Sequence, residues 1–217
     1  MATLDGIRVT NSLRRLAAAK ANIFGAIGHH FVLNPPLAEA EVVAFEQRYQ
    51  VRLPADYRHF LTSIGNGGAG PYYGVFPLGE WYGAGSKLET WREGDGLIGV
   101  LSKPFPLTDT WNDLRGMPSS ELQQTAEQEY ERQYDEFEKR YWDSSLVNGA
   151  IPICEIGCAL RIWLVLTGPL AGHLWRDGRA DNTGLVPLRL ADGSRATFSP
   201  WYTEWLEDAL ESATHRR

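Results

Sequence analysis

Residues 53–74 read LPADYRHFLTSIGNGGAGPYYG and change within one stretch from a helical pattern to a glycine-rich loop. The apolar residues of the first part recur at the three- and four-residue spacing of one helix face: Tyr57, Phe60, Leu61 and Ile64. Pro54 is suited to the first turn of this helix, and Gly65 to its end. The stretch therefore predicts a helix that buries one face, followed by the strand-like Pro71, Tyr72 and Tyr73.

Three glycines of this stretch, Gly65, Gly67 and Gly70, match the dinucleotide-binding pattern G-x-G-x-x-G. That pattern binds a pyrophosphate only where a strand enters the loop and a helix leaves it, so that the helix N-terminus meets the phosphates. Here the helix comes first, so the glycines are interpreted as a helix end and a tight turn.

On the N-terminal side, residues 1–33 are predicted to be a helical extension, with one peripheral helix within residues 4–27. A second helix is expected over Leu37–Tyr49, after the Asn34-Pro35 pair. On the C-terminal side, residues 151–154, 160–166, 171–175 and 185–188 are predicted to be strands. The segment 160–166 is apolar on both faces, which is typical of a central strand. Ser199 and Pro200 begin a last helix with an apolar face that includes Trp201 and Trp205.

Residues 119–141 are predicted to form one inserted acidic helix, with a narrow apolar stripe. Its residues 121–141 hold seven acidic side chains against three basic ones, a net charge of −4 out of the −6 of the whole chain. The stripe consists of Leu122, Ala126, Tyr130, Tyr134, Phe137 and Tyr141.

The composition narrows the class of protein. The 217 residues suit one domain, and a sequence pI near 5.4 argues against a protein that binds the phosphate backbone of nucleic acid directly. The apolar runs are far shorter than the roughly 20 residues of a membrane helix. Cys154 and Cys158 are too few for a disulfide framework, which favours a reducing cytoplasm.

Candidate chemical sites are few. Asp177, Asp181 and Asn182 lack the spacing of a calcium loop and are interpreted as a turn, and the two cysteines lack partners for a zinc shell and are interpreted as buried thiols. No histidine lies in a catalytic signature, and His59 points away from the buried stripe. We therefore expect no enzyme activity, no metal and no cofactor. A small-ligand or hydrolytic site among Tyr73, Trp81, His173 and Asp177 stays an alternative.

Aromatic residues in glycine-rich or polar surroundings are the other candidates. Core and interface positions are equally compatible with the sequence around Tyr72, Tyr73, Trp81, Trp91 and Trp175.

Taken together, the order of motifs resembles the SUKH superfamily, which includes yeast cell-wall regulators of the Smi/Knr type and many bacterial immunity proteins. The resemblance extends over most of the chain. It rests on Asn34 to Leu37 before Glu46, on Leu53, Pro54, Asp56, Tyr57, Arg58, Phe60 and Leu61, on Gly65 to Gly74, on Ile151 to Cys154, Gly157, Cys158, Leu164 to Gly168, Gly172 and Trp175, and on Phe198 to Leu206.

The resemblance implies a single α+β domain over residues 1–217, with helices flanking a mostly antiparallel sheet. It also implies a non-enzymatic protein that binds another protein. Bacterial members bind a cognate toxin domain, often a nuclease; the alternative is a regulatory scaffold with endogenous partners. Residues that we expect to be structural are Pro54, Tyr57, Asn66, Gly67, Gly68, Gly74, Trp163 and Trp205.

The leading hypothesis is a cytoplasmic immunity protein whose acidic side chains meet a basic toxin surface. Its candidate partner-binding residues are Tyr72, Tyr73, Trp81, Glu127, Glu131, Asp135, Trp175 and Asp177. Neither the identity of the partner nor the oligomeric state follows from the sequence.

Overall fold

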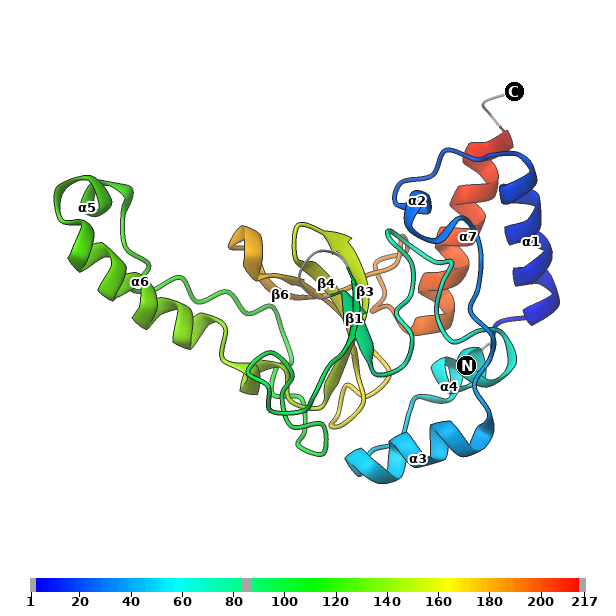
Figure 1. The fold of residues 1–217 in the computed structure, drawn as a ribbon, viewed down its shortest axis with the longest axis horizontal. Coiled ribbons are helices and arrows are strands. Elements are labelled where there is room, and N and C mark those ends of the chain that lie inside the picture. The colour runs from blue at the N-terminus through cyan, green and yellow to red at the C-terminus, as the bar shows by residue number, and fades with distance from the viewer. Residues whose placement is uncertain (1–2, 83–86, 215–217) are drawn as a thin grey trace.

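The computed structural model describes residues 3–82 and 87–214. Its helices and strands, with two short 3-10 helices (η), follow one another along the chain as shown in Figure 1. In order, they are α1 (Gly6–Ala18), α2 (Ala26–His29), α3 (Glu39–Tyr49), α4 (Ala55–Ser63), β1 (Glu80–Tyr82), β2 (Leu88–Thr90), α5 (Ser120–Thr125), α6 (Glu127–Tyr141), η2 (Ser144–Val147), β3 (Ala150–Gly157), β4 (Leu160–Val165), β5 (Leu174–Gly178), η3 (Arg179–Asp181), β6 (Gly184–Pro187) and α7 (Phe198–Thr214).

The central sheet is a four-stranded antiparallel meander in the order β3-β4-β5-β6. β4 is an inner strand, and its Trp163 lies opposite Pro152 on one side and Trp175 on the other. Residues 162–165 of β4 are all buried, as expected for a strand that is apolar on both faces. The predicted α+β class and the antiparallel sheet are confirmed.

Helices α1, α2, α3, α4 and α7 lie on one side of this sheet (Figure 1), and aromatic rings join α4 to α7. The ring of Phe198 in α7 lies 4.9 Å from both Tyr57 and Phe60 of α4. The carboxylate of Asp56 accepts the backbone N–H of Ser199 at 3.0 Å, which holds the start of α7 against α4. The predicted stripe of α4 is therefore buried, as expected.

The glycine-rich loop fills the space between these helices and the sheet. Gly67 and Gly68 have positive φ, and a Cβ on either glycine would meet backbone atoms closer than 3.0 Å. The side chain of Asn66 accepts the backbone N–H of Leu78 at 2.8 Å. Gly74 also has positive φ, and its amide bonds back to Pro71 at 3.0 Å. These contacts give the glycines a steric reason and require no nucleotide.

Two predicted helices are divided in the structure. The helix expected over 4–27 ends at Ala18, and α2 follows after a turn at Gly25. Gly25 has φ +77° and lies so close to the backbone carbonyl of Tyr72 that a Cβ would overlap it. The expected helix over 119–141 breaks at Ala126, whose φ of −151° and ψ of 69° are not helical. Neither boundary carries a proline that would have indicated it.

The two cysteines differ in burial. Cys154 lies in the core, as predicted, but Cys158 is exposed in the turn between β3 and β4, so the expectation of two buried thiols is wrong for Cys158. Cys158 and Ala159 both have positive φ, which matches the geometry that two-residue hairpin turns need. No helix in the described part of the chain is long and apolar enough to cross a membrane.

Candidate protein-binding surfaces

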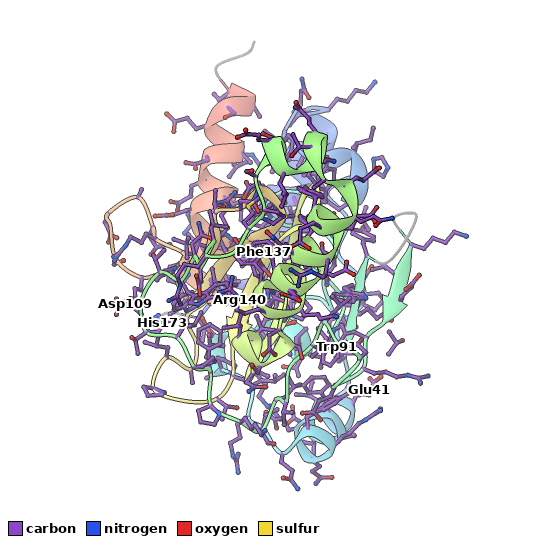
Figure 2. All side chains as sticks on the ribbon, turned by 90° about the vertical axis from the view of Figure 1, so that its left-hand side faces the viewer. Glu41, Trp91, Asp109, Phe137, Arg140 and His173 are labelled. Carbon is purple, nitrogen blue, oxygen red and sulfur yellow. The ribbon has the colours of Figure 1, made fainter. Side chains whose placement is uncertain are left out.

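The most prominent surface feature is the pair of helices α5 and α6, which projects from the sheet on the side opposite to α1 and α7 (Figure 1). We call residues 119–141 the arm. Figure 2 views the molecule from the side of the arm and shows α6 in front of the sheet, with Phe137 and Arg140 labelled on it. The 15 residues of α6 correspond to a rod about 22 Å long.

One face of the arm carries acidic side chains that have no basic partner. Glu127, Glu131 and Asp135 follow at intervals of four residues, so they lie on the same face of α6, and all three are exposed. No ion pair joins any of them to another residue in the described ranges. On another side of the helix, Arg132 pairs with Glu129 at 2.6 Å and with Glu136 at 2.7 Å. The unbalanced negative charge of the arm therefore lies mainly on one face, which we call the acidic stripe.

Beside the acidic stripe runs a row of stacked aromatic rings. The rings of Tyr130 and Tyr134 are 5.8 Å apart and nearly parallel, and those of Phe137 and Tyr141 are 4.9 Å apart. Burial changes along the row: Tyr130 and Tyr134 are half-buried, whereas Phe137 and Tyr141 are buried. The row thus runs from a surface suited to contact with another protein into the core that fixes the helix.

The inner end of the arm is held by polar contacts. The hydroxyl of Tyr141 donates to Asn112 Oδ1 at 2.6 Å, and the side-chain amide of Asn112 donates to the carbonyl of Asn182 at 2.7 Å. Arg140 pairs with Asp113 at 3.1 Å. Because these bonds join α6 to two separate segments, the arm is fixed in direction at its base.

Below this base lies a buried ion pair. Arg179 donates from Nε and Nη2 to the two carboxylate oxygens of Asp177 at 2.9 and 2.7 Å, and both side chains are almost inaccessible, at 3% and 2% exposure. Trp163 Nε1 donates to the same carboxylate at 3.1 Å. The guanidinium also lies 4.7 Å from the ring centre of Trp142, directly after α6. The pair therefore connects the base of the arm to β4 and β5.

The structure corrects three of the candidate partner-binding residues. Asp177 is buried in its ion pair, Trp175 is fully buried with its ring 4.9 Å from that of Phe105, and Trp81 is buried under the guanidinium of Arg161 at 4.9 Å. Trp91, for which an interface position was considered, is buried as well. The ring of Trp91 packs against Phe45 and Tyr49 of α3. None of these four buried side chains is available to a docking partner.

The residues of the alternative small-ligand site do not come together. Tyr73 packs against Gly157 at one end of the β3-β4 hairpin, whereas His173 bonds to Val165 at the other end of β4. Asp177 is engaged by Arg179. The described part of the chain also contains no group of three or more His, Cys, Asp or Glu side chains that could hold a metal ion.

A second surface lies around α2, and only part of it was predicted. The rings of Tyr72 and Tyr73 lie 6.4 and 5.6 Å from that of Phe24, and both tyrosines are half-buried. Three nearby apolar side chains face solvent: Phe24 at 64%, Ile27 at 80% and Val32 at 64% exposure. A groove of about 740 Å³ runs along this surface. We call it the α2 groove; its lining includes Lys20, Ile23, Phe24, Ile27, His30 and Tyr73.

At the end of α2, His29 is buried between aromatic rings. Its ring lies 5.5 Å from Phe31 and 6.0 Å from Trp205, and its Nδ1 accepts the backbone N–H of Phe31 at 3.0 Å. Burial lowers the pKa of His29 from 6.5 to about 4, and a backbone contact with Gly70 offsets this only in part. The neutral imidazole is thus a structural element of the α2 segment.

Comparison with known proteins fits this architecture. The sequence model of the SMI1/KNR4 family (SUKH-1) matches residues 36–175. The chain belongs to the SMI1/KNR4 family. Within this SUKH-1 member, the match spans α3 to β5 and includes the arm, while α1, α2 and α7 lie outside it. No curated protein and no solved structure matches the chain.

Proposed function

We propose that this SUKH-1 protein is a non-enzymatic immunity protein that neutralises a cognate bacterial toxin by stoichiometric binding. The observation that carries the proposal is the acidic stripe of Glu127, Glu131 and Asp135, which has no basic partner among the described residues and lies beside half-buried aromatic rings on a projecting, anchored arm. Family membership supports a SUKH-type protein, and members of this group are commonly immunity proteins.

The chemistry of the arm favours a basic partner. Nucleases bind phosphate groups and therefore tend to present clustered Lys and Arg, so we propose that the toxin is a nuclease. Opposite fields accelerate the encounter, by a factor of 10 or more at low salt, and penalise partners of the wrong charge. Tyr130 and Tyr134 supply the large, rigid contact area that dominates the affinity of many interfaces.

Binding alone is sufficient for this function. A stoichiometric inhibitor needs no nucleophile, metal or cofactor, only a surface that remains in place while the partner docks. The anchoring of Tyr141 and Arg140 at the base of α6 meets that need, because a pre-oriented surface loses little conformational freedom on binding. We place the protein in the cytoplasm of the producing cell, where such a toxin would act.

The test uses the toxin encoded beside the gene, co-expressed with the full chain. The arm variant is Glu131→Lys with Asp135→Lys; Glu127 stays, because an acidic residue in the first turn stabilises the helix. We expect the association rate to fall about tenfold at low salt and the difference from the unmodified chain to shrink at high salt. Asp208→Lys, an exposed charge reversal on α7, is the matched control and is expected to bind normally.

Unchanged association kinetics and an unchanged salt dependence in the arm variant would exclude the arm as the contact surface. Failure of the unmodified chain to bind any neighbouring toxin or protect cells from it would exclude immunity. A gene without a toxin neighbour, whose deletion alters growth or envelope morphology, would support the regulatory scaffold; two interaction surfaces on opposite sides of the sheet are compatible with that role.

A further inference from the structure

The α2 groove needs a separate explanation, because strongly exposed apolar side chains gather beside it and the arm alone accounts for the proposed function. Phe24, Ile27 and Val32 lie within nine residues of one another and are each more than half exposed. Scattered single apolar residues are ordinary on protein surfaces, but a contiguous group beside a groove is typical of an interaction site.

The charges around the groove restrict what can occupy it. Its lining contains Lys20 and His30, both exposed, and no acidic residue. Residues 6–31 as a whole contain Arg8, Arg14, Arg15 and Lys20 but no Asp or Glu, and of these Arg8 is already paired with Glu207 of α7. The groove therefore fits a segment that combines apolar or aromatic side chains with carboxylates.

The arm has this combination. Tyr130 and Tyr134 are half-buried and lie next to the carboxylates of Glu127, Glu131 and Asp135. An amphipathic helix that lays its apolar face into a groove is a common mode of recognition. In Figure 1, however, α5 and α6 extend away from α2 on the far side of the sheet, and in Figure 2 the arm stands in front of the sheet with α1 behind it, so the arm cannot reach the groove of its own chain.

We propose that the α2 groove binds the arm of a second copy of this chain. The contact is heterologous: the arm of one copy meets the groove of the next. A symmetric groove-to-groove contact would bring Lys20 of one copy near Lys20 of the other, and a symmetric arm-to-arm contact would oppose two acidic stripes. Only the arm-to-groove pairing sets opposite charges against each other.

The pairing has a consequence for the proposed function. One arm cannot occupy a groove and a basic toxin at the same time, so toxin binding and self-association exclude each other. The assembled form would store the protein, and the toxin would release it. In this arrangement the toxin contacts the arm and does not contact the groove.

The experiment measures the mass of the full chain in solution against concentration, by light scattering and sedimentation. The unmodified chain is expected to grow beyond a dimer, because a heterologous contact leaves one free arm and one free groove at the ends. The groove variant is Phe24→Ser with Ile27→Ser, which removes exposed apolar lining without adding a charge that the Lys-bearing arm could attract. The arm variant is Glu131→Lys with Asp135→Lys. Each alone is expected to be monomeric, whereas an equimolar mixture of the two forms a dimer that grows no further.

Matched controls separate the surface from general effects. Ile7→Ser changes a similarly exposed apolar residue on α1, and Asp208→Lys reverses an exposed charge on α7; both are expected to associate as the unmodified chain does. Raising the ionic strength from about 0.1 M to about 1 M should weaken the association about tenfold. The groove variant should still neutralise the toxin, so the failure of this inference is distinguishable from failure of the proposed function.

Three outcomes would overturn the inference: an unmodified chain that stays monomeric at all concentrations, a groove variant that still associates, or a mixture of the two variants that remains monomeric. Association of the mixture beyond a dimer would also overturn it, because that result requires a contact other than the single arm-to-groove pairing.

Discussion

Replacement of Arg179 by Met tests the buried ion pair that connects the arm to the sheet. The substitution keeps much of the side-chain volume but leaves the carboxylate of Asp177 without its two guanidinium bonds, at 2.9 and 2.7 Å, and with only Trp163 Nε1 and one backbone N–H at 3.1 Å. Removing one partner of a buried pair costs about 3–5 kcal/mol, because the remaining charge stays desolvated. Since a domain of this size is stable by about 5–15 kcal/mol, the loss should be large.

The free energy of unfolding is measured from urea titrations of the unmodified chain, Arg179→Met, Asp177→Leu and the double variant. The double variant should be more stable than Arg179→Met alone, because it removes the unpaired charge, and the cycle isolates the interaction between the two side chains. A loss below about 1 kcal/mol at pH 7 would refute this account of the base of the arm.

Other predictions concern single sites. The pKa of His29 is about 4 in the folded chain and 6.5 in the unfolded one. The neutral ring therefore adds about 3 kcal/mol to the free energy of unfolding above pH 6.5, and this is lost as the pH falls to 4. When the free energy of unfolding is measured against pH, His29→Gln should lack this loss. Gly25→Ala should lower the free energy of unfolding by more than about 2 kcal/mol, because the new Cβ would overlap a backbone carbonyl. Gly193→Ala, at a position with positive φ and open space, should lower it by about 1 kcal/mol. Equal melting temperatures of the two variants would contradict this. In the native protein a thiol reagent should modify Cys158 and spare Cys154, whose pKa is raised by burial, and mass spectrometry showing two rapid additions would contradict this.

Local patterns in the sequence were enough to predict the elements of the core. The stripe of α4 and the two-sided apolar pattern of β4 each place their side chains by spacing alone, and both are buried as predicted. The trio Glu127, Glu131 and Asp135 shares a helix face for the same reason. Their lack of ion-pair partners could not be predicted, because it depends on Arg132 bonding to Glu129 and Glu136 instead.

Several of the wrong predictions depended on contacts with distant residues. Trp175 is followed by polar residues, and its sequence surroundings were equally compatible with a core and an interface position. In the fold it pairs with Trp163, and its ring lies 4.9 Å from that of Phe105. Asp177 looked like a surface carboxylate until Arg179 was found folded back onto it. The helix expected within residues 4–27 would have included Ile27, but α1 ends at Ala18 and the chain turns at Gly25, which lies against the backbone of Tyr72.

The graded burial along α6 separates what the fold requires from what recognition requires. Phe137 and Tyr141 belong to the core, so changes there would destabilise the whole domain. The outer turns, from Glu127 to Tyr134, contain no buried residue, and substitutions at such positions typically shift stability by less than about 0.5 kcal/mol. Mutations can therefore accumulate in these turns and change the exposed surface of the arm while the scaffold beneath stays intact.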